Sequence, residues 1–194
     1  MLSALTAERV RHQHAKSRLR EIIKRESLLT GETLQLASGG VSDIYFDMKK
    51  TMLDPEGANL AAQAILEILE SEDFDCIGGL AMGAIPIITA VCMKSFPHRP
   101  LRVFFVRREA KHHGTKKLID GYLENNSTVV ILDDVTTTGG SVLEAVKAVK
   151  ERGCRVSKVI TILDRLEGAK ENLEKEGIEL IALFTIDEFP NKQL

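Results

Sequence analysis

The chain has 194 residues, of which 44% are hydrophobic and 28% charged, and its formal net charge is −2. This length and composition predict one soluble globular domain with a sizeable core. The weak net charge argues against bulk electrostatic binding to nucleic acid or to anionic membranes. The first residues lack the apolar run of a secretory signal, and no stretch approaches the ~20 apolar residues of a membrane span.

The cysteine pattern argues against a disulfide framework or a metal site. Cys76, Cys92 and Cys154 are far apart and show no metal-ligand spacing. An odd number of cysteines without an export signal predicts reduced thiols and a cytoplasmic location. We expect these residues to be small parts of the core, because free cysteine is often buried.

The N-terminal third predicts a helix, a pair of strands and a second helix. Residues 6–26 carry apolar side chains at helical spacing. The stretch TLQLASGGVSDIYFDM predicts two short strands around Gly39-Gly40. A helix begins at Asp54-Pro55-Glu56, which combines an N-cap residue, a proline at the first helical position and an acid in the first turn.

Strands and helices alternate in the rest of the chain. The predicted strands are CIGGL, LRVFFVR, TVVILDD, VSKVITILD and IELIALFTI. The predicted helices are IPIITAVCMK, GGSVLEAVKAVKERG, which ends at Gly153, and EGAKENLEKEG. Strands rich in valine, isoleucine and leucine between helices are typical of a parallel sheet covered on both faces. The sequence therefore predicts a doubly wound α/β fold with a mainly parallel sheet, as a single domain over residues 1–194.

An acidic pair ends the strand TVVILDD, and a small polar loop follows it. Asp133 and Asp134 lie at a carboxyl end, which is where ligands bind in such sheets. The next residues open a helix, whose unpaired N–H groups and dipole favour a phosphate. The loop matches neither GxGxxG nor GxxxxGK[ST], which weakens the dinucleotide-binding and Walker-type readings. Either the ligand carries vicinal hydroxyls for the two carboxylates, or aspartate caps the helix.

The stretch DDVTTTGGS, after an apolar strand, resembles the 5-phosphoribosyl-1-pyrophosphate (PRPP) motif of the type I phosphoribosyltransferases. The resemblance implies that the acids contact the ribose hydroxyls and that the loop holds the 5′-phosphate. The PRPP-binding residues that it implies are Asp133, Asp134, Val135, Thr136, Thr137, Thr138, Gly139, Gly140 and Ser141. It also implies Mg²⁺ held mainly by PRPP, with Asp133 or Asp134 nearby and no direct protein site.

The basic segment VRREAKHHGTKKLIDG is either a solvated charged loop or a mobile loop that neutralises a pyrophosphate leaving group. Its spacing resembles the R-K-E-x-K-x-H-G catalytic loop of the orotate phosphoribosyltransferases, which reaches into the neighbouring subunit's site. The resemblance implies a homodimer and implies PRPP contacts by Arg107, Arg108, Lys111 and His113. Arg108 replaces the usual lysine, which keeps the charge and changes its geometry. The implied catalytic residues are Lys111, His113, Asp133 and Asp134.

Two segments resemble the base-binding parts of the same family. ILDRLEGA matches the D-R-x-E-G-A segment, whose arginine, here Arg165, contacts orotate, and Thr137 is the second implied contact. The alternative for Arg165 is an ion pair with a neighbouring acid. LASGGVSDIYFDMKK resembles the hood segment S-G-x-x-S-x-x-Y-F-D-x-R, which places Tyr45 and Phe46 beside orotate and makes residues 1–50 an N-terminal helix and hood. The alternative is that these aromatic residues belong to the core.

The segment GGLAMGAIPIITA resembles the family's pyrophosphate loop. Some members carry lysine before the S-G of the hood and lysine in the pyrophosphate loop, where this chain has Ala37 and Gly83. These departures leave more of the pyrophosphate charge to the mobile loop.

The resemblance covers roughly residues 15–185 and implies a complete reaction. The chain is expected to transfer the phosphoribosyl group of PRPP to orotate, giving orotidine 5′-phosphate and diphosphate in pyrimidine (UMP) biosynthesis. Its expected partners are these substrates and a second copy of itself, with neither nucleic acid nor membrane. The alternatives are transfer to another base, and a PRPP-sensing regulator without turnover, which would need a basic face or an added DNA-binding domain.

Overall fold

A computed structural model describes the backbone of residues 2–35, 41–109 and 118–189, and the side chains within 12–29, 44–109 and 118–189. The described part of the chain forms a six-stranded sheet, in the order β5-β4-β3-β6-β7-β8, and a separate two-stranded sheet. The strands of the larger sheet are β3 (Cys76–Leu80), β4 (Arg102–Val106), β5 (Ile119–Gly121), β6 (Thr128–Thr136), β7 (Arg155–Asp164) and β8 (Glu179–Thr185). All neighbours in it are parallel except β5, which pairs antiparallel with β4. This confirms the mainly parallel sheet.

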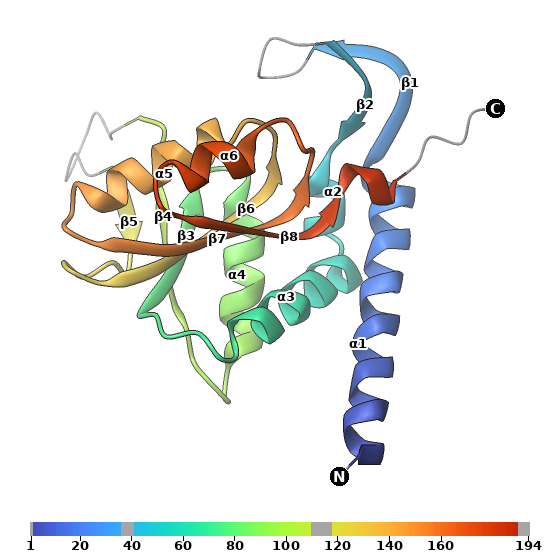
Figure 1. Cartoon of the computed structure of the whole chain (residues 1–194), viewed down its shortest axis with the longest axis horizontal. Coiled ribbons are helices and arrows are strands. Elements are labelled where there is room, and N and C mark those ends of the chain that lie inside the picture. The colour runs from blue at the N-terminus through green and yellow to red at the C-terminus, as the bar shows by residue number, and fades with distance from the viewer. Residues whose placement is uncertain (1, 36–40, 110–117, 190–194) are drawn as a thin grey trace.

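Helices cover both faces of the sheet, as Figure 1 shows. On one side lie α3 (Pro55–Leu69) and α4 (Ala84–Ser95), with the long α1 (Leu2–Ile22) beside α3. On the other side lie α5 (Gly140–Lys150) and α6 (Ala169–Glu174). The fold is therefore doubly wound, as predicted, and the ends of β6 and β7 lie between the two helical layers.

The local signals explain the main elements. β6 is buried along most of its length because its residues are almost continuously apolar before the acids. At the start of α3 the Asp54 carboxylate accepts a hydrogen bond of 2.8 Å from the Gly57 amide, and Pro55 follows the cap. Gly139 has a φ of +81°, which glycine adopts readily, and it turns the chain from β6 into α5.

The N-terminal part forms a hairpin beside the sheet. After α1, a short π-helical turn (Ile23–Ser27) leads into β1 (Leu28–Gln35), which pairs antiparallel with β2 (Val41–Phe46). Figure 1 shows this hairpin beside the carboxyl ends of β7 and β8. The two predicted strands are thus confirmed.

Three short elements were not predicted, namely β5, α2 (Met48–Met52) and a 3₁₀ turn (Ile186–Glu188). They are too short for a periodic pattern to reveal them. In addition, β6 continues two residues beyond the predicted end, to Thr136, because it pairs with β7 as far as Asp164. The acidic pair therefore lies within the last residues of the strand.

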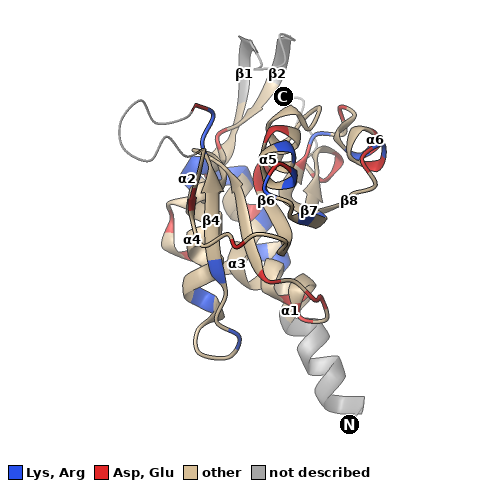
Figure 2. Ribbon diagram, turned by 90° about the vertical axis from the view of Figure 1, so that its left-hand side faces the viewer, with Lys and Arg blue, Asp and Glu red and all other residues tan. Residues whose placement is uncertain are grey.

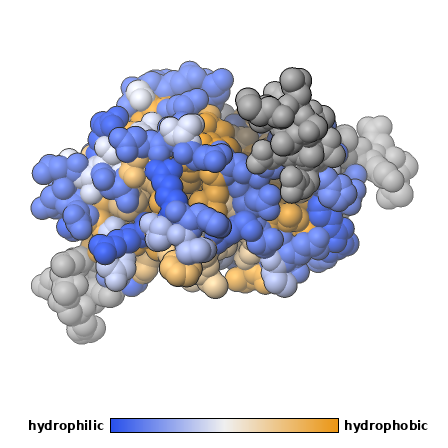
Figure 3. Space-filling model, turned by 90° about the horizontal axis from the view of Figure 1, so that it is seen from below, coloured by the Kyte–Doolittle hydropathy of each residue, from blue (hydrophilic) through white to orange (hydrophobic). Residues whose placement is uncertain are grey.

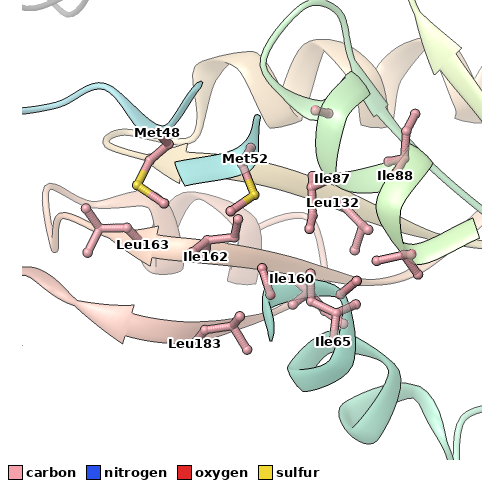
Figure 4. Packing of buried hydrophobic residues seen from close by; sticks show 14 of the residues in the cluster. Met48, Met52, Ile65, Ile87, Ile88, Leu132, Ile160, Ile162, Leu163 and Leu183 are labelled. Carbon is pink, nitrogen blue, oxygen red and sulfur yellow. The ribbon is translucent and has the colours of Figure 1, made fainter. Parts of the chain in front are cut away.

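Two apolar clusters form the core, one on each face of the sheet. Figure 4 shows part of the first, in which side chains of α2, α3 and α4 meet those of β6, β7 and β8. The second lies between the sheet and α5. All three cysteines are free, and Cys76 and Cys154 are buried. Burial raises the pKa of the Cys76 thiol to about 12, so it is un-ionised and inert. Among the described residues, no helix has the length and apolar character of a membrane span.

Candidate active site

The acidic pair at the end of β6 combines a buried and a half-buried carboxylate. Asp133 is 7% exposed and Asp134 is half-buried, with its Oδ1 atom accepting a hydrogen bond of 3.0 Å from the Val135 amide. Burial, followed by the charge of Asp134, raises the pKa of Asp133 well above its ordinary value. Burial also raises the pKa of Asp134. Both groups would gain stability as carboxylates from a ligand that donates hydrogen bonds or brings positive charge.

The loop from β6 to α5 is held from behind by α6. The Thr137 carbonyl accepts a hydrogen bond of 3.1 Å from the Ala169 amide, and the Thr138 carbonyl accepts one of 2.9 Å from Asn172 Nδ2. Both contacts are accepted by backbone carbonyl groups of the loop. The first amides of α5 lack partners within the helix, which makes this helix start a suitable seat for a phosphate.

Arg165 joins three parts of the site at the end of β7. It is 6% exposed, and its Nε donates a hydrogen bond of 2.8 Å to Glu167 Oε1. Its Nη1 donates one of 3.0 Å to the Ile44 carbonyl of β2, and its amide donates one of 2.9 Å to the Thr136 carbonyl. Arg165 therefore forms the ion pair with a neighbouring acid that was the alternative to orotate binding. The same side chain nonetheless lies between the hood strand and the phosphate loop.

The two hood aromatic residues occupy different environments. Phe46 is 5% exposed, and its ring packs edge-to-face against Phe189 with centroids 5.3 Å apart. Tyr45 is only half-buried. The structure thus places the Phe46 ring in the core, and a contact of either residue with orotate stays a prediction.

The basic segment that follows β4 begins with Arg107 and Arg108. Figure 2 shows basic residues near the end of that strand. Arg107 forms an ion pair with Asp120 of β5, at 2.7 Å from Nε and 2.6 Å from Nη2 to the same oxygen. Arg108 reaches the start of α5, where its Nη2 donates a hydrogen bond of 3.0 Å to Ser141 Oγ and its Nη1 lies 3.5 Å from Glu144 Oε2. The predicted residues Lys111 and His113 lie outside the described residues.

The loop between β3 and α4 approaches the acidic pair closely. A Cβ atom built on Gly83 would lie 2.7 Å from Asp134 Oδ1. The segment that resembles a pyrophosphate loop therefore lies beside the carboxylate predicted to contact ribose. Ala37, the other departure from the family pattern, lies outside the described residues.

Sequence reasoning assigned no role in the site to Asp164 or Asp120. Thr136 Oγ1 lies 3.3 Å from Asp164 Oδ1, and that oxygen also accepts a hydrogen bond of 3.0 Å from the Leu166 amide. Asp120 was missed because its partnership with Arg107 depends on the unpredicted strand β5. The contacts of Asp164 with Thr136 and of Asp120 with Arg107 join separate segments of the chain, so no local pattern could have revealed them.

The fold, together with an acidic pair and a phosphate-type loop at the end of β6, defines a type I phosphoribosyltransferase domain. A family model described as "Phosphoribosyl transferase domain" matches residues 50–192. An orotate phosphoribosyltransferase of a Bradyrhizobium species is 45% identical over 180 residues, which cover 90% of this chain and 97% of that relative. One from Methanocaldococcus jannaschii is 44% identical over 178 residues, which cover 92% and 98% of the two chains.

Solved structures agree with these relatives. The orotate phosphoribosyltransferase of Mycobacterium tuberculosis in complex with Fe(III) dicitrate has a TM-score of 0.80 at 33% identity, and the match covers 91% of this chain and 99% of that one. The same enzyme in complex with PRPP has a TM-score of 0.76 at 31% identity, with 90% and 98% covered. This chain belongs to the orotate phosphoribosyltransferase family.

Proposed function

We propose that this chain transfers the 5-phosphoribosyl group of PRPP to orotate, giving orotidine 5′-phosphate and diphosphate in de novo pyrimidine biosynthesis. The observation that carries the proposal is the hydrogen bond from the Arg165 amide to the Thr136 carbonyl. It places the arginine expected to bind the base directly beside the loop expected to bind the phosphate. The family relationship supplies the substrates.

The phosphoribosyl group would bind along the end of β6. The loop and the start of α5 would hold the 5′-phosphate through backbone amides and hydroxyl groups. The Asp133 and Asp134 carboxylates would accept hydrogen bonds from the ribose hydroxyls, which favours their ionised form. As the bond from C1 to diphosphate breaks, the sugar gains oxocarbenium character, and two nearby negative charges stabilise it. The loop residues in this role are Val135, Thr136, Thr137, Thr138, Gly139, Gly140 and Ser141.

Orotate would bind between the hood and the end of β7. The guanidinium of Arg165 is a suitable partner for an acidic pyrimidine, and its contact with the Ile44 carbonyl keeps it next to the hood strand. Thr137 and Tyr45 would complete the base site. Phe46, through its packing against Phe189, would hold the strand that carries Tyr45.

The basic segment after β4 would neutralise the departing diphosphate. Arg108 already reaches the start of α5 through Ser141 and Glu144, so it can exchange these contacts for ligand oxygens. Arg107, Lys111 and His113 would add charge, and Lys111 or His113 would supply a proton or only charge to the leaving group. Because bringing these groups together excludes water, their electrostatic effect would increase.

Mg²⁺ is the proposed cofactor. Within the described ranges no group of three or more His, Cys, Asp or Glu side chains could hold a metal. The carboxylates Asp133 and Asp134 would lie near a cation whose ligands are mainly PRPP oxygens and water, as Mg²⁺ prefers. Such a cation would offset diphosphate charge, while the residues of this chain position the sugar and the base.

We also propose a homodimer in which the segment after β4 completes the partner's site. Large apolar side chains are exposed at Leu53, Met82, Met93 and Phe96, each between 71% and 76%. Figure 3 shows apolar side chains at the surface among hydrophilic ones. Exposed apolar surface of this kind favours association with another chain.

The domain proposal treats residues 1–194 as one unit, with residues 1–50 as its N-terminal helix and hood. The hydrogen bond between Arg165 and the Ile44 carbonyl and the packing of Phe46 on Phe189 both link this N-terminal part to the sheet. The three free cysteines agree with a reducing cytoplasmic location, which is the proposed one.

The test of the reaction is the loss of orotate absorbance with purified protein, PRPP and Mg²⁺. Parallel wells contain hypoxanthine, guanine, adenine or uracil, and an Asp133→Asn variant controls for contaminating enzymes. Orotate consumption that needs both PRPP and Mg²⁺ is the expected result. Consumption of another base, or PRPP binding without any turnover, would overturn the assignment of orotate.

A mixing experiment tests the shared loop. Lys111→Ala and Arg165→Ala chains are each expected to have little activity as homodimers. If the loop acts on the partner's site, a heterodimer has one site with both defects and one site with neither. Activity that returns on mixing supports the dimer proposal, whereas activity that stays at the sum of the two variants contradicts it.

A further inference from the structure

Helix α2 is firmly attached to the core although it has only five residues. Its Met48 and Met52 side chains are 1% and 3% exposed, and Figure 4 shows them pointing toward β7. On the other side, Thr51 Oγ1 lies 2.6 Å from Ser27 Oγ in a buried hydrogen bond, and the Thr51 amide donates to the same Ser27 oxygen at 3.2 Å. Apolar packing and a satisfied polar contact thus fix the position of the helix.

Lys49 lies on this fixed helix, which packs against α4, the helix that directly follows the β3–α4 loop. Its Nζ lies 2.7 Å from Asp47 Oδ1, and its side chain is 59% exposed. The Asp47 amide is itself held by a hydrogen bond of 2.9 Å to the Ser27 carbonyl. An ion pair as exposed as this contributes little to fold stability. The pair therefore orients a charge at the rim of the site and leaves the ammonium group accessible to a ligand.

Two residues of the candidate site act electrostatically on Lys49. The hydrogen bond with Asp47 raises the pKa of Lys49, and the charges of Tyr45 and Asp134 raise it further. Burial raises the pKa of Asp134, and Lys49 acts in the opposite direction. Lys49 is thus within electrostatic range of one residue proposed to contact the base and of another proposed to contact ribose.

The Asp134 carboxylate lies against the β3–α4 loop, which contains no charged residue. Gly83 approaches Asp134 so closely that a side chain there would meet the carboxylate. A diphosphate bound beside this loop would bring several negative charges close to the Asp134 carboxylate. A cation on a rigid element would add to the positive charge proposed for the basic segment and Mg²⁺, and Lys49 lies within electrostatic range of Asp134.

We propose that Lys49 is a further substrate-binding residue, which contacts the diphosphate group of PRPP, and that Asp47 is its positioning residue. The inference rests on the proposed function and adds to it one contact outside the phosphate loop and the basic segment. On binding, the ammonium group would turn from the Asp47 carboxylate toward the phosphate oxygens, and no covalent bond of the protein changes.

The experiment compares Lys49→Gln with Lys50→Gln, an exposed lysine on the same helix. Both variants are first shown to unfold at the same temperature as the wild type. Initial rates are then measured in both directions, with PRPP and orotate or with diphosphate and orotidine 5′-phosphate. We expect Lys49→Gln to raise KM for PRPP and for diphosphate by roughly 10- to 100-fold, as for loss of one charged hydrogen bond. KM for orotate and for orotidine 5′-phosphate should stay unchanged, and Lys49→Arg should restore much of the loss.

Three outcomes would overturn the inference. In the first, Lys49→Gln has the same four KM values as Lys50→Gln. In the second, Lys49→Gln raises KM for orotate and orotidine 5′-phosphate as much as KM for PRPP and diphosphate. Failure of the proposed function is recognised separately, because the wild type would then not consume orotate. In that case calorimetry measures the affinity for PRPP in the presence of Mg²⁺. Equal affinities of the wild type and Lys49→Gln would be the third outcome that overturns the inference.

Discussion

The contact between Gly83 and Asp134 leads to a prediction whose size follows from the geometry. The Cβ atom of an alanine at position 83 would lie 2.7 Å from Asp134 Oδ1, whereas ordinary contacts begin at 3.4 Å, so the carboxylate must withdraw by about 0.7 Å. The φ of Gly83 is −55°, which alanine adopts without strain. We therefore expect Gly83→Ala to change the free energy of unfolding by less than ~1 kcal/mol.

The effect on the reaction should be much larger than the effect on stability. A displacement of a catalytic group that approaches 1 Å can lower kcat/KM by about 100-fold. We expect Gly83→Ala to lower kcat/KM for PRPP by roughly 10- to 100-fold in the orotate absorbance assay.

A double-mutant cycle shows whether the loss acts through Asp134. If the methyl group acts only by displacing that carboxylate, then Gly83→Ala should have little further effect in an Asp134→Asn background. Wild-type kcat/KM in Gly83→Ala would refute the reasoning. So would losses that multiply independently in the double variant, because the alanine would then act elsewhere.

Four further predictions follow from single residues. The raised pKa of Asp133 means that the folded state binds its proton more tightly than the unfolded state does. The contribution of Asp133 to the free energy of unfolding is therefore present below the ordinary pKa of 3.8 and is lost as pH rises through the pKa of the folded state. Asp133→Asn should therefore abolish turnover but unfold at higher urea concentration than the wild type at neutral pH, and a pH series of urea curves that overlay would contradict this. Arg165→Ala should raise KM for orotate far more than KM for PRPP; unchanged kinetics with orotate would remove its role. Lys111→Ala should strongly lower kcat while calorimetry shows PRPP binding weakened less, and wild-type rates would remove the loop assignment. Phe46→Ala should destabilise the fold by roughly 3–5 kcal/mol through lost packing, whereas an unchanged melting temperature would show that the ring is not part of the core.

Much of the site could be predicted because its signals are local. The acids, the small polar loop and the helix start occupy one continuous stretch, DDVTTTGGS, so chain connectivity alone keeps them together. The cap at Asp54 and the turn at Gly139 are local in the same sense, since each depends on backbone geometry within a few residues. The alternation of apolar strands and helices was likewise sufficient for the doubly wound sheet.

Other features depend on contacts between distant segments. The sequence could not distinguish Phe46 as a core ring from Phe46 as a base contact, because both need an aromatic side chain on the hood strand. Its packing against Phe189 is decided by where the last strand ends. The partners of Arg107 and Arg165 similarly depend on β5 and β2, which pair or pack only in the folded chain.

The sequence by itself determined the class of fold, the acidic pair and the phosphate loop, because strand and helix periodicity and turn chemistry act over a few residues. Only the tertiary structure decided which groups face one another across the site. Gly83 meets Asp134, and Lys49 lies within electrostatic range of it, because strand order and the anchoring of α2 bring three separate segments together. Such contacts depend on packing over the whole domain, and no short stretch of residues encodes them.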